Sequence, residues 1–517
     1  MAAVTVGPGT SFLKSGQEYK ESLRDGREVW YDGERVDDVT THPATAGGID
    51  IIADMYDDQL RAETRDLTTY VREDGARIGM GFVVPRSPDD LRARRECAEH
   101  YFRKTFGVFG RQIDMIPTVD CGLIWLLPEL RVHDPERAEN NVTYVNWAQE
   151  NNVMQSAPVA DPQGFRSRGS ALGRRGTVLF SDERGDQPYN VEADFLVVEN
   201  GKRIANSLRV IHEDAAGIVI SGAKVVGSVA PQVQEITVSN LTIPDPVPEA
   251  ALYCRVPANS PGLKMICREL VTNPGASLVD HPIDARGEEM DCLVIYEEVF
   301  VPWWRVGVYR WTDFGPCYTR FGALEWWHTM TRLCVKAELF VGLLQSVIDA
   351  IGTGHRPGVR ALTAEVIEYA EILRGMVIAA EVGAKYNDEG VLFPDVMKTT
   401  AGRAYAVERY PGIIHRLQEL AGQGPILRWS EKTMNHPELG PRLDWIFEGA
   451  GMSARDKNLF MNLLWDVTSS SHAGRVEIFE NVNGAPLPAL RERLYNEYDR
   501  RPHINAVRRF LRMNELE

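Results

Sequence analysis

Cysteine is scarce in this sequence, and the few present form no recognisable framework. The seven cysteines are odd in number and dispersed, and no two are spaced as CxxC: Cys97, Cys121, Cys254, Cys267, Cys292, Cys317 and Cys334. Disulfide scaffolds and structural zinc sites need paired, closely spaced cysteines. The histidines add no cluster of their own. The pattern therefore favours reduced thiols in a cytoplasmic protein, and we expect no metal centre.

Leader, membrane-spanning and strongly basic segments are also lacking. Residues 1–8 contain no basic stretch followed by an apolar one, so they predict no secretory signal. No run reaches about 18 uncharged apolar residues, the length that a membrane-spanning helix needs. The net charge of −16 argues against non-specific nucleic-acid binding, which requires a basic surface. With 44% hydrophobic and 25% charged residues, the composition is that of a soluble globular protein.

Three regions with different residue patterns divide the chain, whose length allows about two to four domains. Residues 1–150 have a mainly helical pattern. Ser87-Pro88 followed by two aspartates predicts a helix start, because acidic side chains favour the positive end of the helix dipole. We expect this helix to run to about Thr105 and to end at Gly107, within an N-terminal helical domain.

Short apolar runs bounded by turn residues characterise residues 151–305. Such runs lie at 195–198, 217–220 and 292–296, with a proline-rich segment at 244–248 between them. Runs of this length, separated by glycine and proline, are typical of strands. We predict a central β domain, built as a barrel or a small sandwich.

Residues 306–517 return to a helical pattern. Apolar residues recur with helical spacing over 333–351, 361–384, 399–420 and 455–467. Pro411 is expected to break or kink the third of these helices. Four helices with wide apolar faces suffice for a bundle or for a helical oligomer interface. We therefore predict a C-terminal four-helix bundle and an α+β chain overall.

One glycine-rich segment could be mistaken for a nucleotide-binding loop. Residues 449–454, Gly-Ala-Gly-Met-Ser-Ala, fit the pattern GxGxxG/A. The true fingerprint follows a strand in a βαβ unit, whereas helical patterns flank this segment on both sides. We interpret it as a helix break. Without a Rossmann unit, any electrons used in a reaction must come from another protein.

The run EYKESLRDGREVWYDGERVDDVTTHPA at residues 18–44 is the most specific pattern in the chain. By residue type alone it predicts a helix end, a turn at Asp32-Gly33 and a short extended piece. The run closely resembles the N-terminal signature of the 4-hydroxyphenylacetate 3-hydroxylase family, the oxygenase halves of two-component, reduced-flavin monooxygenases. The similarity extends from about Glu18 to Tyr498, through residues 221–224 and 301–303 and a C-terminal segment.

This resemblance implies a fold, a reaction and partners. The fold is acyl-CoA-dehydrogenase-like, and the reaction hydroxylates an aromatic or heteroaromatic small molecule through a flavin C4a-hydroperoxide. The substrate is either free or tethered to a carrier in a pathway of secondary metabolism. Reduced FAD is the expected cosubstrate, with FMN as the alternative, and a separate NAD(P)H-flavin reductase supplies it. A homotetramer built on the C-terminal helices is also implied.

Three segments correspond to flavin-binding stretches of the family. Ser228 follows Ser221-Gly222-Ala223-Lys224, a predicted strand–turn–strand that residue type alone would make a hairpin bending at Gly222. Residues 161–166 resemble a second stretch, in which Phe165 stands where the family has aspartate. In the third stretch, small residues let the backbone approach the cofactor. The candidate cofactor-binding residues are Gln163, Arg166, Ser228, Ser471, His472, Ala473 and Gly474.

The substrate stretch departs from the family pattern. Residues 110–115 correspond to Gly-Arg-x-x-Asp-Tyr of the phenol hydroxylases, so Arg111 and Asp114 are the candidate catalytic residues. Met115 stands in place of the tyrosine, and Ala157 falls where a phenol-contacting histidine is expected. Methionine and alanine cannot help to form a phenolate. We predict a more apolar pocket, lined by Arg111, Met115, Gln155 and Ala157. Either Asp114 or Gln155 replaces the lost groups, or the substrate needs no such activation.

Two other classes stay open. One is an oxygen-independent flavin enzyme, a dehydratase, isomerase or dehydrogenase acting on an acyl thioester. A family relative, 4-hydroxybutyryl-CoA dehydratase, holds an iron–sulfur cluster with three cysteines and a histidine. Cys97, His281 and Cys292 fall in broadly the right regions, but their spacing is wrong and no third cysteine accompanies them. The other is a non-catalytic oligomeric relative, which the missing tyrosine and histidine make conceivable. Oxygen dependence and flavin binding distinguish these classes from a monooxygenase.

Overall fold

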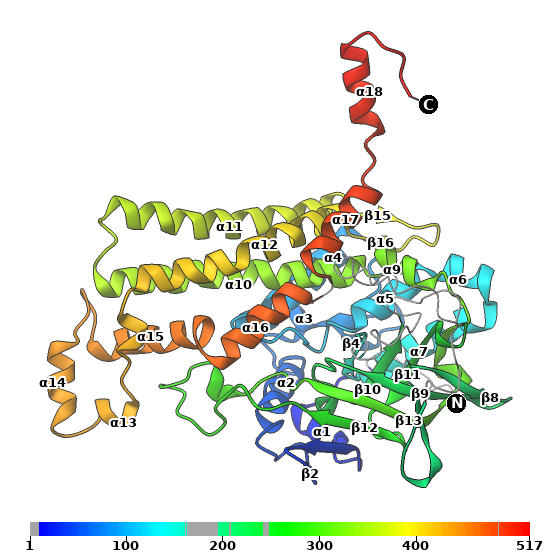
Figure 1. Ribbon diagram of the computed structural model, residues 1–517, viewed down its shortest axis with the longest axis horizontal. Coiled ribbons are helices and arrows are strands. Elements are labelled where there is room, and N and C mark those ends of the chain that lie inside the picture. Colours follow the sequence, from blue (N-terminus) through cyan, green and yellow to red (C-terminus); the bar gives the residue numbers. More distant parts are fainter. Residues whose placement is uncertain are drawn as a thin grey trace.

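Long helices and two β-sheets occupy opposite sides of the molecule. The computed structural model describes residues 10–160, 162, 195–205, 208–240, 248–483 and 485–516. Figure 1 shows the helices α10, α11 and α12 along one side and most of the strands on the other. Helices α4 and α5 pack against α10, so the N-terminal part of the chain fills the space between the two sides.

The N-terminal region is mainly helical, as predicted. Its helices are α1 (Gly16–Ser22), α2 (Ala46–Asp58), α3 (Arg65–Thr68), α4 (Pro88–Lys104), α5 (Pro117–Trp125), α6 (Leu127–His133) and α7 (Pro135–Asn151). The short strands are β1 (Glu28–Tyr31), β2 (Glu34–Arg35), β3 (Thr69–Val71) and β4 (Arg77–Gly79), with a single 3-10 turn at Met80–Phe82.

The predicted boundaries of α4 are confirmed, and the reason is local. The Ser87 hydroxyl accepts a hydrogen bond from the Asp90 backbone N–H at 3.2 Å, which satisfies one of the free N–H groups of the first turn. Pro88 occupies a first-turn position that needs no N–H donor. Beyond the last turn, Gly107 has a left-handed φ of 68°, which a side chain would disfavour.

The signature run also folds as its residue types predict. Helix α1 ends at Ser22, and Asp32 and Gly33 form a turn with φ angles of 51° and 80° between β1 and β2. Strand β1 then pairs in parallel with the central strand β12. The N-terminal signature is therefore built into the central sheet, while the predicted domain limits at 150 and 305 stay predictions.

The central region forms two sheets. Their further strands are β5 (Gln155–Ser156), β8 (Arg209–Glu213), β9 (Gly217–Lys224), β10 (Glu235–Ser239), β11 (Leu252–Pro257), β12 (Leu263–Cys267), β13 (Cys292–Pro302) and β14 (Val306–Tyr309). One sheet has the order β2-β1-β12-β13-β9-β8, and the other β14-β11-β10-β5. A small hairpin joins β6 (Phe195–Val197) to β7 (Arg203–Ala205). One hydrophobic core includes residues of both large sheets, as expected for a sandwich.

The predicted bend at Gly222 is wrong. Strand β9 continues through Gly222 to Lys224, and Gly222 pairs with Tyr296 of β13. Gly222 has a φ of 141°, and the register of the pair shifts beside it. The glycine therefore accommodates an irregularity inside a strand. The turn lies a few residues later, where Val226 and Val229 have φ angles of 58° and 59°.

The C-terminal region is helical, with one small hairpin. Its helices are α9 (Phe314–Phe321), α10 (Ala323–Ile351), α11 (Pro357–Val382), α12 (Val396–Ala421), α13 (Glu431–Met434), α14 (Leu439–Ile446), α15 (Ala454–Thr468), α16 (Ser471–Val482), α17 (Leu487–Glu497) and α18 (Arg501–Phe510). The hairpin consists of β15 (Lys385–Tyr386) and β16 (Leu392–Phe393). The four predicted helices correspond to α10, α11, α12 and α15, and α12 runs through Pro411 without a break.

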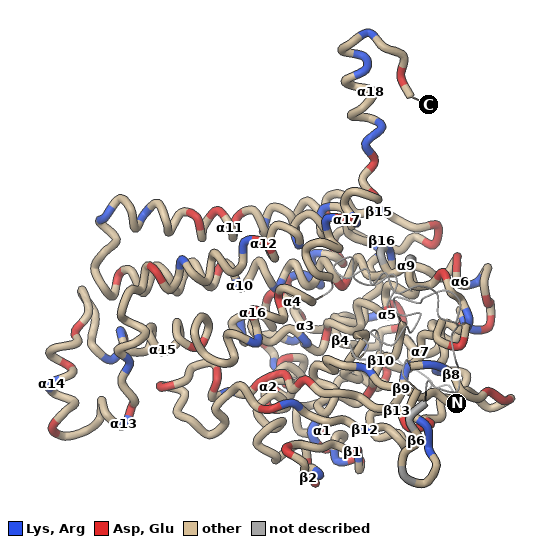
Figure 2. Tube along the Cα trace, in the orientation of Figure 1, with Lys and Arg blue, Asp and Glu red and all other residues tan. Residues whose placement is uncertain are grey.

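Further expectations from the sequence can be compared with the structure. The GxGxxG-like segment forms a tight turn between α14 and α15, in which Gly449 bridges Met452, so it is no part of a βαβ unit. All seven cysteines are buried and free. Both signs of charge occur throughout the trace in Figure 2. Within the part of the chain that the structure describes, no helix combines the length and apolar character that crossing a membrane requires.

Candidate active site

The loop that carries Arg111 is fixed from two sides. A side chain at Gly107 would place its Cβ 2.8 Å from the Cβ of Lys336, so the loop can pass α10 this closely only with glycine there. Further along, the Glu289 carboxylate accepts hydrogen bonds from the backbone N–H groups of Gly110, at 2.8 Å, and of Arg111. The backbone of Arg111 is thereby held in one place.

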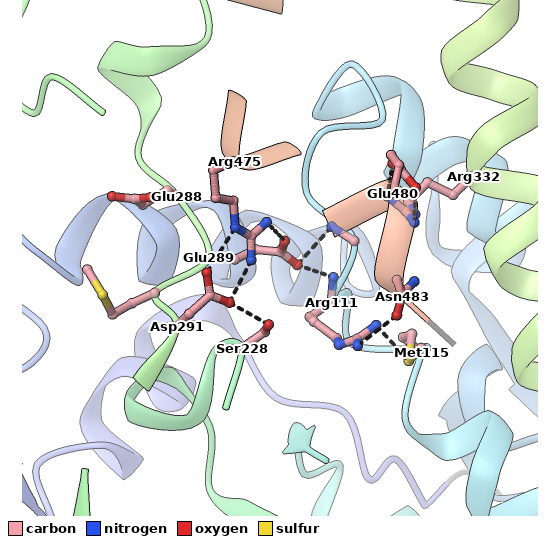
Figure 3. A network of polar contacts seen from close by, with 12 residues as sticks. Arg111, Met115, Ser228, Glu288, Glu289, Asp291, Arg332, Arg475, Glu480 and Asn483 are labelled. Atoms are coloured by element: carbon pink, nitrogen blue, oxygen red, sulfur yellow. Dashed lines mark hydrogen bonds and ion pairs between the residues drawn. The ribbon is translucent and has the colours of Figure 1, made fainter. Parts of the chain in front are cut away.

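The Arg111 side chain is held by the end of α16. Its guanidinium donates a hydrogen bond to Asn483 Oδ1 at 3.1 Å and stands over the Phe479 ring at 5.3 Å. The Met115 sulfur lies 3.9 Å from Arg111 Nη1. Figure 3 shows Arg111, Met115 and Asn483 side by side. The structure therefore brings together two of the residues that the sequence predicted to contact substrate.

Arg475 is the centre of the polar network in Figure 3. Its guanidinium contacts Glu289 at 2.8 Å and both carboxylate oxygens of Asp291 at 2.9 and 2.7 Å. Burial acts to raise the pKa of Asp291, but the charges of Arg475 and Arg268 hold it well below its usual range. The same pairing raises the pKa of Arg475 against the effect of burial. Both groups are therefore charged over the physiological pH range.

Ser228 joins this network from the central sheet. Its hydroxyl donates to Asp291 Oδ1 at 2.5 Å, and its carbonyl accepts from the Ser156 hydroxyl at 2.8 Å. The second contact brings Ala157, the residue after Ser156, close to Ser228. Arg475 thus links, through Glu289, Asp291 and its own helix, the three segments that carry Arg111, Ser228 and Gly474.

The segment Ser471–Gly474 forms the first turn of α16. The Ser470 hydroxyl accepts a hydrogen bond from the Ala473 backbone N–H at 3.0 Å and caps the helix. A Cβ built on Gly474 would meet no atom within 4 Å. The backbone at this position is therefore open to an approaching group.

His472 lies on a buried side of α16. Its Nδ1 is 3.1 Å from Asp284 Oδ1, and the side chain lines a cavity of about 320 Å³ together with residues of α2, α4 and the 278–287 segment. Asp284, His281 and Asp466 form a group whose candidate ligand atoms lie within 4.8 Å of one another. The backbone N–H groups of Ile283 and Asp284 donate to Asp466, which gives that carboxylate a structural role without an ion. The expectation of no metal centre stays a prediction.

Asp114 and Gln155 have partners inside the protein. The Nε2 atom of His328 on α10 lies 3.1 Å from Asp114 Oδ2, and both side chains are buried. The Gln155 amide donates to Asp120 at 2.7 Å and accepts from Thr237 at 3.1 Å. Both polar ends of Gln155 are therefore engaged in the core. Gln163 and Arg166 lie outside the described residues.

Sequence reasoning missed a polar stripe on α10. Four polar residues recur every three or four positions along this largely apolar helix, and the last three of them contact the 107–116 loop or α16: Glu325, His328, Arg332 and Lys336. Their spacing was visible, and polar residues on one face of a buried helix need partners. The partner of Arg332 and Lys336 is Glu480 of α16.

Glu480 is surrounded by cations. It contacts Arg332 at 2.5 and 2.8 Å and Lys336 at 2.5 Å, and Arg403 donates to the nearby Asn483 carbonyl. Burial opposes ionisation, but these cations lower the pKa of Glu480 to about 2. Burial also lowers the pKa of Lys336 to about 8, and that of Arg403 to about 10. Positive charge therefore exceeds negative charge on the side of α16 that holds Arg111.

This arrangement defines a class of protein. A mainly helical N-terminal part, two central sheets and a C-terminal helical bundle, with the candidate residues gathered where they meet, make the acyl-CoA-dehydrogenase-like fold. The chain belongs to the 4-hydroxyphenylacetate 3-hydroxylase family. The N-terminal model of that family matches residues 15–178 and 199–308, and its C-terminal model matches residues 315–512.

Individual relatives agree with this assignment. The chain is 31% identical to the oxygenase component of a 4-nitrophenol 4-monooxygenase/4-nitrocatechol 2-monooxygenase from Rhodococcus opacus, over 93% of this chain and 87% of the relative. It is 30% identical to the oxygenase component of a 4-hydroxyphenylacetate 3-monooxygenase from Thermus thermophilus, over 96% and 97%.

Solved structures are also similar. The crystal structure of a 4-hydroxyphenylacetate 3-monooxygenase oxygenase component complexed with FAD matches with a TM-score of 0.84 and 28% identity, over 96% of this chain and 98% of that one. An archaeal 4-hydroxybutyryl-CoA dehydratase matches with a TM-score of 0.81 and 20% identity, over 98% of this chain and 96% of that one, which is a likeness of fold.

Proposed function

We propose that this chain is the oxygenase component of a two-component monooxygenase that uses reduced FAD to hydroxylate an aromatic small molecule. The observation that carries the proposal is the Arg475 network. It gathers Arg111, Ser228 and the first turn of α16, the three stretches that correspond to substrate and flavin segments of the family. Relatives named as oxygenase components of aromatic monooxygenases support the same activity.

The residues present fit a flavin. Gln112 follows Arg111 in the sequence, and its side chain is buried. Neither its amide nitrogen nor its amide oxygen has a hydrogen-bond partner among the described residues. A buried, unpartnered amide is costly unless a ligand satisfies it. The edge of a flavin ring offers both an N–H group and carbonyl oxygens, which match an amide. Open space beside Gly474 would let the ring or its side chain approach the backbone of α16.

The protein itself contributes by binding the cofactor and by excluding water from the site. Reduced FAD, when bound, supplies the electrons with which oxygen is activated. In the proposal Ser228, Gly474 and the rest of the Ser471–Gly474 turn hold the cofactor. Met115 and Ala157 form an apolar wall that excludes water, which protects reactive intermediates from decay. Arg111 donates hydrogen bonds to the oxygen that becomes negatively charged during the reaction.

The first experiment mixes the protein with reduced FAD without oxygen, then adds oxygen in a stopped-flow spectrometer. The proposal expects an absorbance transient, distinct from reduced and oxidised FAD, that persists for seconds. Oxidation at the rate of free flavin, without such a transient, would favour the oxygen-independent or the non-catalytic class. Repeating the experiment with reduced FMN tests which flavin is used.

Substitution of Arg111 tests the site itself. Arg111→Ala should lower the yield of hydroxylated product by about 10²-fold, the usual effect of removing one donor to a developing charge. Binding of reduced FAD should persist, because Asp291, Ser228 and Arg475 are unchanged. Arg92→Ala on the exposed face of α4 is the matched control and should behave as the wild type. An unchanged yield with Arg111→Ala would remove this residue from the reaction.

A homotetramer and a separate NAD(P)H-flavin reductase complete the proposal. Support for self-association comes from α18, which has no buried residue and stands away from the rest of the molecule in Figure 1. Its apolar residues Val507 and Phe510 are 60% and 88% exposed. An isolated helix of this length is marginal in water, so a partner surface is expected to cover it. Light scattering on the purified chain measures the oligomeric state directly.

A further inference from the structure

A tyrosine–carboxylate pair lies at the junction of α9 and α10. The Tyr318 hydroxyl donates a hydrogen bond to the Glu325 carboxylate. The ring of Tyr318 is fixed by edge contacts with Phe321 at 5.1 Å and Trp326 at 5.5 Å. Glu325 is buried, whereas Tyr318 keeps partial exposure within this apolar surrounding. The pair is therefore held in one geometry, and the tyrosine is not fully enclosed.

The pair lies close to Arg111. Helix α5, which begins directly after the Arg111–Met115 loop, touches α9 so closely that a Cβ on Gly122 would be 2.0 Å from the Phe321 carbonyl oxygen. Burial, followed by the charge of Glu325, raises the pKa of Tyr318 well above its usual value, and the positive charge of Arg111 opposes this rise. On α10, Glu325 lies one turn before His328, whose ring contacts Asp114 of the Arg111–Met115 loop at 3.1 Å.

Other charged groups face the pair as well. Burial lowers the pKa of Arg403 of α12, and the charges of Glu480 and, more weakly, Glu325 oppose this fall. Arg403 donates to the carbonyl of Asn483, the residue that holds Arg111. Arg493 of α17 lies over the Trp326 ring at 3.7 Å and is also influenced by Tyr318. The pair thus stands among guanidinium groups of a loop and two helices.

We propose that Tyr318 and Glu325 take the proton of a phenolic substrate, in place of the tyrosine and histidine positions occupied here by Met115 and Ala157. This inference rests on the proposed function. The substrate O–H bond breaks, its proton passes to Tyr318 Oη, and the proton of Tyr318 passes to Glu325 Oε2. The phenolate remains beside the Arg111 guanidinium. No electrons change hands, and the carboxyl releases its proton to solvent later in the cycle.

The pair fits this task better than the two groups that the sequence indicated. Asp114 is bonded to His328 in the buried interior, and Gln155 uses both ends of its amide in the core. Tyr318 alone among these residues keeps partial exposure. Because its pKa is raised, its hydroxyl stays protonated, so it acts as a relay to Glu325 and not as the final base.

The test compares two substrates that differ in ionisation. One is a phenol that is neutral at the assay pH, and the other is a nitrophenol assayed above its own pKa, so that no proton need be removed. Tyr318→Phe and, separately, Glu325→Gln should lower the product formed per oxygen consumed by about 10²-fold with the neutral phenol, and by less than about twofold with the nitrophenolate. With the neutral phenol, the pH of half-maximal yield should shift up towards the substrate's own pKa.

The matched control is Tyr309→Phe, which removes the same type of tyrosine–carboxylate bond, to Glu213, on the surface. It should leave both yields unchanged. Thermal unfolding and binding of reduced FAD check that each variant folds. Equal losses on both substrates would mean that the pair only shapes the pocket, and no loss would overturn the inference outright. A wild type that consumes oxygen but hydroxylates neither substrate would instead overturn the proposed function.

Discussion

Helix α16 carries two charged clusters in which the signs of charge are exchanged. Near its start, the cation Arg475 lies between the carboxylates Glu289 and Asp291. Near its end, the carboxylate Glu480 lies between the cations Arg332 and Lys336. Figure 3 shows both clusters with Arg111 between them. The helix therefore presents opposite arrangements of charge to the two sides of the candidate site.

The difference lies in what each cluster joins. Arg475 connects a helix of the C-terminal region to Glu289 and Asp291, at the end of a long loop before β13. Glu480 joins α16 to α10 within the helical bundle. Its two partners, Arg332 and Lys336, are both cations, so the cluster has a net positive charge. The first cluster assembles the site from distant segments. The second fixes the helix and gives the Arg111 side of the candidate site a positive potential. In the proposed function this potential would stabilise a substrate that becomes an anion.

Removing the central carboxylate of the second cluster should have the largest effect on stability. Glu480→Gln keeps the size of the side chain but leaves Arg332 and Lys336 buried without a counter-charge. Breaking a buried ion pair in this way costs about 3–5 kcal/mol of unfolding free energy. Chemical denaturation at neutral pH measures the loss. Glu477→Gln is the matched control, since Glu477 lies on the same helix without an ion pair among the described residues.

Acid should make the wild type resemble that variant. The folded pKa of Glu480 is about 2, below its ordinary value of 4.5, so the stability it contributes is complete above about pH 4.5 and is lost as pH falls towards 2. The gap in unfolding free energy between wild type and Glu480→Gln should therefore narrow over this window. A gap that stays constant would mean that the cost of the variant comes from packing and not from charge.

Removing the centre of the first cluster should have a smaller effect on stability and a larger one on the cofactor. Arg475→Met leaves Glu289 without its ion pair, but Arg268 still contacts Asp291 at 2.9 Å. We expect the free energy of unfolding to fall by no more than about 3 kcal/mol, the lower end of the cost of breaking a buried ion pair. Reduced FAD should bind more weakly, because Ser228 and α16 are no longer tied together. Arg475→Lys should recover part of this stability, because lysine keeps the positive charge but cannot bond both carboxylates as the planar guanidinium does.

A variant of Arg475 that binds reduced FAD as tightly as the wild type would contradict the role given to this cluster. It would mean that the first turn of α16 and Ser228 keep their positions independently. Isothermal titration with reduced FAD in the absence of oxygen, alongside thermal unfolding, separates this outcome from a general loss of folded protein.

The smallest effect on stability is expected at Gly474. Because a Cβ there meets no atom within 4 Å, Gly474→Ala should leave stability unchanged or raise it by up to about 1 kcal/mol, the helix preference of alanine over glycine. If the cofactor approaches this backbone, FAD binding should weaken by about tenfold, or ~1.4 kcal/mol. Gly375→Ala on α11 is the matched control, since that position is equally open but distant in the fold. Unchanged FAD binding in both variants would exclude Gly474 from the cofactor site.

Local residue patterns predicted the elements well. Ser87 and the acidic residues after it set the start of α4, and Asp32-Gly33 set the turn between β1 and β2. The bend expected at Gly222 failed for a tertiary reason, since β13 supplies the partner that keeps this glycine inside a strand. The same limit applies to Ser471–Gly474, whose helical state depends on a cap and on packing that residue types leave open.

The candidate site was only partly predictable. Arg111, Met115, Ser228 and Gly474 were identified through similarity to a family, and the structure brings the first two together with Asn483. The polar residues of α10 were visible in the sequence but had no assigned partner. A buried ion pair is specified by two residues far apart in the chain, and neither residue indicates the other.

The sequence by itself determined the family, the order of helical and β regions and the ends of most elements, because these depend on side chains within a few residues of one another. The tertiary structure decided which charges meet. Arg475 contacts Asp291 and Glu289 across 184 and 186 residues of sequence, and Glu480 contacts Arg332 across 148. Such pairs form only where folded segments exclude water, because a buried charge is stable only when an opposite charge lies beside it.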